Sequence, residues 1–181
     1  MSIQFNIKES DLINGVKIIS PSISADARGD IWTSYTTENL HKIIPENLSF
    51  KHDKFSQSKK NVLRGLHGDH KSWKFVTCVY GEIYQVVADL RENSDTYSNW
   101  QSFDISKANQ QLILIPPGVA NAYYVKSNEA VYHYKLAYEG NYIDADEQFT
   151  VSWNDPRFNI SWPTKRPILS IRDAEVQNGT N

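Results

Sequence analysis

The segment Asn61–His70, with the sequence NVLRGLHGDH, carries the side chains best suited to proton transfer and anion binding. Histidine can act as a general base near neutral pH, because its ordinary pKa is about 6.5. Arginine presents a planar guanidinium that matches the oxygens of a phosphate. Gly65 permits a bulge or a close backbone approach, so it can bring Arg64 and His67 together without a helix. A single histidine or arginine on a strand is more often structural, and the segment alone does not define a site.

A second segment, Leu114–Tyr124, has the sequence LIPPGVANAYY and predicts a strand, a rigid Pro-Pro-Gly turn and a further strand. A simple hairpin would explain it. Together the two segments invite comparison with metal-binding cupins, in which two motifs supply three histidines and a glutamate to one ion. The pattern fails, because His67 and His70 would point to opposite faces of a strand and Asn121 stands where a histidine is required. We therefore expect no bound catalytic metal and no cofactor.

Strands must position these segments, because turn residues punctuate the chain and the stretches between them alternate polar with apolar side chains. The clearest alternation is in Glu82–Leu90, where Gln85 and Asp89 share a face with aliphatic side chains, as in a lumen that binds a polar ligand. A helix is expected only at Glu38–Ile44. Many short strands with a single minor helix predict an all-β fold, a sandwich or jelly roll. Further strands are expected at Gly15–Ser20, Gly29–Tyr35, Leu48–Ser56, Trp73–Tyr80, Trp100–Ile105, Gln111–Ile115 and Ala130–Tyr138.

Length and composition predict one globular domain over residues 1–181, with a core at about 15–173 and a frayed polar tail at 174–181. The 19 Lys and Arg nearly balance the 21 Asp and Glu, which argues against nucleic acid as the main partner. Cys78 is the only cysteine, so no intrachain disulfide can form and a reducing compartment is expected. The N-terminus lacks a signal pattern, and no apolar run approaches a membrane span. We therefore expect a cytoplasmic protein with no membrane partner.

From about Gly15 to Asp173 the chain resembles the dTDP-4-dehydrorhamnose 3,5-epimerase family. The resemblance implies a cupin-type jelly roll, a homodimer that exchanges strands, no metal, and epimerisation of a nucleotide-linked 4-keto sugar. The matching motifs follow the family's order: DARG (Asp26–Gly29), VLRGLH (Val62–His67), WKFVTCVYGEIYQVVADLR (Trp73–Arg91), NSDTY (Asn93–Tyr97), IPPGVAN (Ile115–Asn121), YHYKLAY (Tyr132–Tyr138), WNDP (Trp153–Pro156), WP (Trp162–Pro163) and ILSIRD (Ile168–Asp173).

The resemblance also implies roles for individual residues. His67 corresponds to the family's base, which removes a carbon-bound proton, and Asp173 to its carboxylate partner. A carboxylate on one ring nitrogen fixes the tautomer and stabilises the imidazolium that forms. Tyr134 corresponds to the acid that returns a proton to the opposite face of the sugar, a task suited to a phenol with a reference pKa of about 10. Lys74 matches the lysine that stabilises negative charge on the carbon-4 oxygen.

Several residues have simpler interpretations when the resemblance is set aside. Asp173 could be a solvated residue of the tail. Tyr132, which shares a strand face with Tyr134, is best explained as part of an aromatic core stripe. Arg28 and Arg64 match arginines that the family places near the substrate diphosphate, although each could be an ordinary surface charge.

The chain departs from the family pattern at positions expected to surround the sugar and the nucleotide. We expect His52 and Asn121 to contact the substrate, the base, acid and lysine to be retained, and the substrate to differ. The combination is similar to the branch that acts on GDP-linked 4-keto heptoses in bacterial capsule synthesis. The replacements are His52 and Lys54 for two amides, Gly68-Asp69 for Tyr-Gln, Gln85 for aspartate and Asn121 for histidine.

The predicted function is therefore inversion of carbon 3, and also of carbon 5, in a nucleoside-diphosphate-linked 4-keto sugar, either a dTDP-4-keto-6-deoxyhexose or a GDP-4-keto-heptose. Both carbons flank the carbonyl, so deprotonation at either gives an enolate that one cation can stabilise. Three alternatives remain open. The first is an epimerase acting on carbon 3 alone, the second is a 3,4-ketoisomerase that moves the carbonyl, and the third is a non-catalytic cupin that binds sugar nucleotides.

Overall fold

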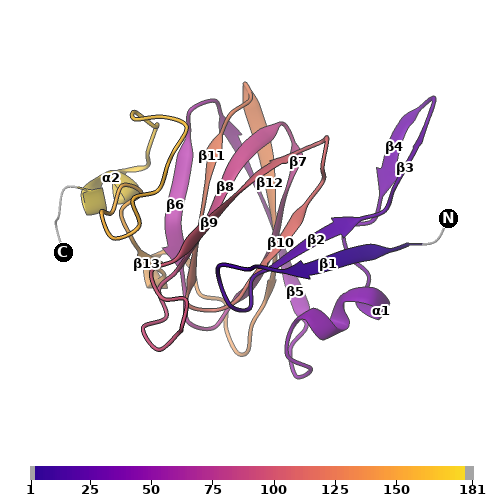
Figure 1. The fold of residues 1–181 in the computed structure, drawn as a ribbon, viewed down its shortest axis with the longest axis horizontal. Coiled ribbons are helices and arrows are strands. Elements are labelled where there is room, and N and C mark those ends of the chain that lie inside the picture. The colour runs from indigo at the N-terminus through magenta and orange to yellow at the C-terminus, as the bar shows by residue number, and fades with distance from the viewer. Residues whose placement is uncertain (1–2, 178–181) are drawn as a thin grey trace.

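The computed structural model describes residues 3–177 of the 181-residue chain, mostly as short strands (Figure 1). The helical elements are α1 (Thr37–Leu40), η1 (His41–Ile43), η2 (Ala145–Glu147) and α2 (Ile171–Gln177). The strands are β1 (Phe5–Glu9), β2 (Lys17–Pro21), β3 (Ile23–Asp26), β4 (Gly29–Trp32), β5 (Phe50–Lys59), β6 (Leu63–Gly68), β7 (Trp73–Tyr80), β8 (Glu82–Asp89), β9 (Trp100–Ser106), β10 (Leu112–Ile115), β11 (Val119–Val125), β12 (Glu129–Ala137) and β13 (Phe149–Thr150).

Two antiparallel sheets face each other (Figure 1). The six-stranded sheet has the order β1-β2-β10-β7-β12-β5, and the five-stranded sheet has the order β13-β6-β11-β8-β9. Strands distant in sequence are neighbours in both sheets, so the chain crosses repeatedly between them. This arrangement confirms the all-β sandwich predicted from the alternation of side chains.

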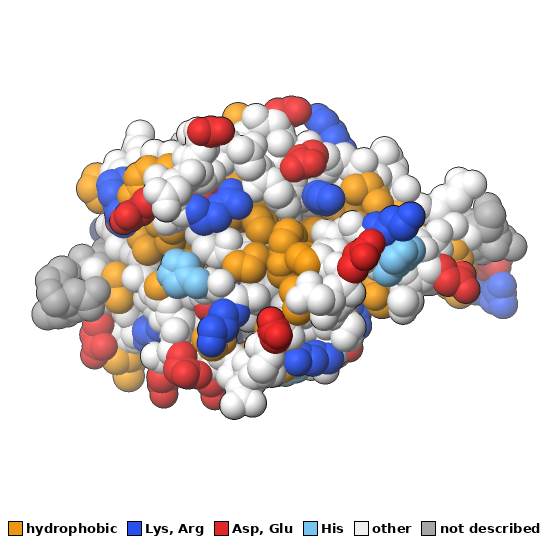
Figure 2. Space-filling model, turned by 90° about the horizontal axis from the view of Figure 1, so that it is seen from below, with side chains coloured by type: hydrophobic (Ala, Val, Ile, Leu, Met, Phe, Trp, Pro, Cys, Tyr) orange, Lys and Arg blue, Asp and Glu red, His pale blue; other side chains and the backbone are white. Residues whose placement is uncertain are grey.

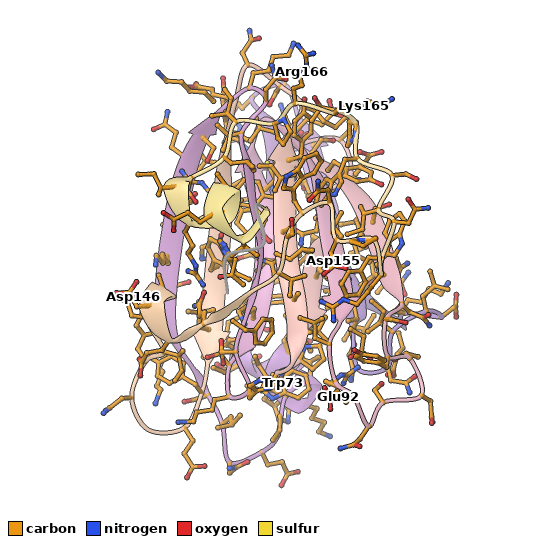
Figure 3. The ribbon with its side chains drawn as sticks, turned by 90° about the vertical axis from the view of Figure 1, so that its left-hand side faces the viewer. Trp73, Glu92, Asp146, Asp155, Lys165 and Arg166 are labelled. Carbon is orange, nitrogen blue, oxygen red and sulfur yellow. The ribbon has the colours of Figure 1, made fainter. Side chains whose placement is uncertain are left out.

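The core lies between the inner faces of the sheets, where Val76 of β7, Val87 of β8 and Val119 of β11 are fully buried in one cluster. Val86, on the opposite face of β8, belongs to a second cluster with Phe158 from the segment that follows β13. Figure 3 views this side of the molecule, with Asp155, Lys165 and Arg166 labelled on the covering segment. Because both faces are covered, nearly all of β8 is buried, and its polar Gln85 is enclosed in the core.

The predicted elements match the structure best where the alternation is strongest. Strand β7 begins and ends at the predicted Trp73 and Tyr80, and β8 ends one residue before the predicted Leu90. The predicted helix is present as α1 followed by η1, and the Thr36 hydroxyl caps α1 by accepting a hydrogen bond from the Asn39 N–H. Helix α2 was not expected, and it continues to Gln177 through part of the segment predicted to fray. Residues 178–181 lie outside the described part of the chain.

A two-stranded hairpin, formed by β3 and β4, projects from the sandwich (Figure 1). Ile31 of β4 is 67% exposed there. Helix α1 and η1 lie at one end of the sandwich, and Figure 2 views the molecule from that side, with hydrophobic side chains in the middle of the face and charged ones around them. Within residues 3–177, no helix is long and apolar enough to cross a membrane.

Candidate active site

A cavity of about 240 Å³ opens between strands of the two sheets and the C-terminal segment. It collects side chains from β5, β6, β7, β11 and β12, from the chain around η2, and from the start of α2. Six of the eight residues predicted to act in the site line this one cavity. The lining residues are Lys54, Ser56, Arg64, His67, Asp69, Ser72, Lys74, Asn121, Tyr134, Leu136, Tyr142, Ala145, Gln148, Ser170, Arg172 and Asp173.

His67 and Asp173 form a hydrogen bond in the cavity wall, with 2.5 Å between Nε2 of the histidine and Oδ1 of the aspartate. The side chain of Asp173 is only 2% exposed, whereas that of His67 is 25% exposed. The second carboxylate oxygen of Asp173 accepts a hydrogen bond from the Ser170 hydroxyl at 2.9 Å. Asp173 is therefore a buried and fully held partner of the imidazole, not a solvated tail residue.

Strand β6 can approach β11 closely because Gly65 lacks a side chain. Its φ of 121° is a backbone conformation that favours glycine, and a Cβ here would collide with Ala122 on β11. This confirms the close backbone approach that the sequence predicted at Gly65. The pairing of β6 with β11 sets His67 directly opposite Asn121, so both side chains reach the same cavity.

The hydroxyl of Tyr134 is available for a ligand. Tyr134 lies on β12 and lines the cavity, and no residue of the described chain hydrogen-bonds its hydroxyl. Burial, together with the neighbouring phenols of Tyr123 and Tyr142, raises the pKa of Tyr134, and the nearby Arg64 opposes only part of this shift. The phenol therefore stays protonated at neutral pH and can donate a proton.

Lys74 forms a buried ion pair with Asp69, with 3.0 Å between Nζ and Oδ2. Burial lowers the pKa of Lys74, and the Asp69 carboxylate opposes this shift. Burial alone would raise the pKa of Asp69, but the charge of Lys74 and the N–H groups of Lys71 and Ser72 hold it below its usual value. The result is an ammonium group fixed in the cavity wall by a carboxylate that is itself fixed by the backbone.

Three further cations line the cavity without a carboxylate partner among residues 3–177. Arg64 donates from Nε to the Ser58 hydroxyl at 3.0 Å, and Arg172 donates from Nε to the Thr150 hydroxyl at 2.7 Å. Lys54 lies 3.3 Å from the Tyr142 hydroxyl. Their uncharged partners leave the positive charges uncompensated, which suits an anionic ligand.

Sequence reasoning had assigned a role to only one of these three cations, Arg64. Lys54 had been noted as a departure from the family pattern, and Arg172 stands beside Asp173 in the motif ILSIRD, so both carried a signal that could have been used. Other lining residues, such as Tyr142 and Gln148, come from irregular chain near η2 and carried no recognisable signal.

Arg28 and His52 do not line the cavity of their own chain. Arg28 lies in the turn of the β3–β4 hairpin, where its side chain is 90% exposed and pairs with Asp26. His52 packs edge-on against Tyr142, a residue of the cavity wall, with 4.6 Å between ring centroids. A part for either residue in substrate binding stays a prediction.

The prediction that no metal is needed rests on the ligand pattern. His67 lines the cavity whereas His70 lies outside it, against the ring of Phe149 at 5.3 Å, and Asn121 is the residue facing His67. No group of three or more His, Cys, Asp or Glu within residues 3–177 is arranged to hold an ion. We expect protein treated with a chelator to keep full turnover. A large loss that one transition metal restores would instead identify a metal cupin.

Known proteins are similar to this chain over most of its length. Residues 10–180 match the family model described as dTDP-4-dehydrorhamnose 3,5-epimerase. The dTDP-4-dehydrorhamnose 3,5-epimerase of Salmonella typhimurium is 35% identical over 166 residues, which cover 90% of this chain and 89% of that protein. A dTDP-4-dehydrorhamnose 3-epimerase of Streptomyces niveus is 32% identical, with 91% and 79% covered. The crystal structure of dTDP-6-deoxy-D-glucose-3,5-epimerase from Legionella pneumophila, in complex with dTDP-4-keto-L-rhamnose, superposes with a TM-score of 0.86 at 33% identity, covering 94% of this chain and 90% of that one.

Proposed function

We propose, on the premise that the chain belongs to the dTDP-4-dehydrorhamnose 3,5-epimerase family and is an isomerase, that it inverts carbons 3 and 5 of a nucleoside-diphosphate-linked 4-keto sugar. The observation that carries the proposal is the hydrogen bond between His67 and Asp173 in a cavity that Tyr134 and Lys74 also line. A base, an acid and a cation are the three groups that epimerisation beside a carbonyl requires.

The first step is removal of a proton from the carbon beside the keto group. Because the Asp173 carboxylate accepts the hydrogen bond at Nε2 of His67, that nitrogen carries the hydrogen and Nδ1 is left with its lone pair. Nδ1 takes the proton, and the electrons of the carbon–hydrogen bond move to the carbon-4 oxygen to form an enolate. Asp173 stabilises the imidazolium that results.

The second step is return of a proton to the other face of the same carbon. The ammonium of Lys74 stabilises the enolate oxygen until this happens. The Tyr134 hydroxyl gives its proton to the carbon and the carbonyl re-forms, after which the tyrosinate and the imidazolium exchange protons with solvent. The same groups can serve carbon 3 and carbon 5 in turn, since both flank the carbonyl.

Two arguments support a diphosphate-linked substrate. Lys54, Arg64 and Arg172 provide positive charge in the cavity without carboxylate partners in the described chain. The relative from Legionella pneumophila was crystallised with a dTDP-linked keto sugar. We propose dTDP or GDP as the carrier and a hexose or a heptose as the sugar, and we propose a cytoplasmic location, which suits the free, buried thiol of Cys78.

The decisive experiment is incubation with dTDP- and GDP-linked 4-keto sugars in deuterium oxide, followed by NMR of the sugar. Deuterium at carbons 3 and 5 with inversion at both is the expected result. Exchange and inversion at carbon 3 alone would indicate the narrower activity named for the relative from Streptomyces niveus. A shifted carbonyl would indicate a ketoisomerase. Binding without any exchange would contradict the proposal and favour a non-catalytic cupin.

We also propose a homodimer in which Arg28 of one subunit completes the cavity of the other. The hairpin that carries Arg28 projects from its own sandwich (Figure 1), and its Ile31 is 67% exposed. Sedimentation should therefore give a dimer at working concentration, and Arg28→Ala should raise KM because a cation near the diphosphate is lost. Arg166→Ala, which removes a cation outside the cavity, is the control. A protein that sediments only as a monomer would contradict this proposal.

A further inference from the structure

Three polar side chains form a hydrogen-bonded chain in the core beneath the cavity. Tyr132 donates from its hydroxyl to Oε1 of Gln85 at 2.6 Å, and Gln85 donates from Nε2 to Oδ1 of Asn121 at 2.5 Å. Tyr132 and Gln85 are fully buried, whereas Asn121 is 6% exposed and lines the cavity. Gln85 and Asn121 are both positions at which the chain departs from the family pattern, and here they are direct partners.

A backbone carbonyl fixes the direction of the hydrogen bonds that link Tyr132, Gln85 and Asn121. Nε2 of Gln85 also donates to the carbonyl oxygen of Val86 at 3.1 Å, and a carbonyl can only accept. The nitrogen of Gln85 must therefore face Val86 and Asn121, while its oxygen faces Tyr132. Asn121 must then turn its own oxygen toward Gln85, and the Tyr132 hydroxyl lies 3.2 Å from that same oxygen.

The opposite end of the Asn121 amide is left for a ligand. With Oδ1 turned to the Gln85 donor, Nδ2 points away from Gln85, and within residues 3–177 no group accepts a hydrogen bond from it. Because Asn121 lines the cavity, this nitrogen can donate a hydrogen bond to a ligand there. Asn121 also faces His67 across β11 and β6, and facing side chains in an antiparallel pair are about 4.5–5.5 Å apart at Cβ.

We propose that Gln85 is a positioning residue that holds the Asn121 amide with its nitrogen toward the cavity, so that Asn121 donates a hydrogen bond to an oxygen of the sugar beside the carbon that His67 deprotonates. This inference rests on the proposed function. A histidine or aspartate at these positions would change charge with pH, whereas an amide pair keeps the same donor and acceptor throughout. Gln85 itself touches no ligand, because it is fully buried and does not line the cavity.

The test is Gln85→Met, which keeps the length of the side chain and removes the donor that orients Asn121. The amide of Asn121 can then rotate, and kcat/KM for the 4-keto sugar nucleotide should fall on the order of 10-fold, the loss expected for one hydrogen bond. The affinities for dTDP and GDP alone should not change, because neither nucleotide carries the 4-keto sugar that Asn121 is proposed to bind. If Gln85→Met does not fold, Gln85→Asn provides the same test, since the shorter amide cannot reach Asn121.

A double-mutant cycle separates positioning from a general structural effect. Asn121→Ala should lower kcat/KM by a similar factor, and adding Gln85→Met to it should cause no further loss. A further loss of about 10-fold in the Asn121→Ala background, or an equal loss of affinity for dTDP or GDP alone, would overturn the inference. Thr77→Val is the matched control, because it removes a buried hydroxyl that bonds the Gln111 carbonyl away from the cavity. It should lower thermal stability and leave kcat/KM unchanged.

The outcome for the wild-type protein distinguishes this inference from the proposed function. A wild-type protein that neither exchanges nor inverts any 4-keto sugar would contradict both. An active wild-type protein whose Gln85→Met variant keeps its full kcat/KM would contradict only the role of Gln85.

Discussion

Replacing His67 with asparagine or alanine should abolish both epimerisation and the exchange of the carbon-bound hydrogen with deuterium oxide. Without the imidazole that Asp173 orients, no base removes the proton and no enolate forms. Every later step depends on the enolate. General bases of this kind contribute about 10²- to 10⁴-fold, so the loss is easily measured. NMR of the sugar nucleotide in deuterium oxide records inversion and exchange in one experiment.

The control for this prediction is His70→Asn, three residues further along the chain. His70 is exposed, lies outside the cavity and contacts the ring of Phe149. This variant should retain both activities. If the His67 variants exchange hydrogen at the normal rate, His67 is not the base, and the assignment of base and acid must be reversed.

Tyr134→Phe should separate the two activities that His67 variants lose together. The enolate can still form, because His67, Asp173 and Lys74 are intact, so deuterium should still enter the sugar with retention of configuration. Inversion should fall by about 10²- to 10⁴-fold, because the opposite face has lost its proton donor. Tyr134 has no hydrogen bond to another described residue, so removing its hydroxyl should leave the fold intact.

Tyr124→Phe is the matched control for the tyrosine variant. Tyr124 is also buried, and its hydroxyl donates to Asn61 at 2.7 Å, outside the cavity. Its loss should lower stability by about 1 kcal/mol and leave the ratio of inversion to exchange unchanged. Loss of exchange in Tyr134→Phe, with normal exchange in the His67 variants, would identify the tyrosinate as the base.

Side-chain alternation was sufficient to predict the sandwich and several of its strands. It worked for β7 and β8, where the two faces of each strand contribute side chains to different core clusters. It was least informative for β6, where Gly65 interrupts the pattern, and for α2, whose seven residues are too few to show a helical period. Short elements such as these are stabilised by contacts with residues that are distant in the sequence, so their local sequence does not predict them.

The candidate active site was harder to predict, because its residues are brought together by contacts between distant parts of the sequence. Asp173 lies 106 residues after His67, and no local pattern links them, so only the resemblance to a family paired them before the structure did. The hydrogen bond between Gln85 and Asn121 could not be predicted either, although the sequence showed that each residue departs from the family pattern. Arg172 and Lys54 reach the cavity through the docking of the chain end and the register of β5 with β12, neither of which a single sequence specifies.

Helix α2 brings Arg172 and Asp173, close to the end of the described chain, to the wall of the cavity between the sheets. Ile171 at its start is 78% exposed, and hydrogen bonds from Asp173 to His67 and from Arg172 to Thr150 tie the helix to the sheet. A short helix at the end of the described chain can open locally while both sheets remain folded. Mild heating or trimming by a carboxypeptidase should therefore inactivate the enzyme well before its β-sheet circular dichroism changes, and substrate bound against Arg172 and Asp173 should protect the chain end from digestion.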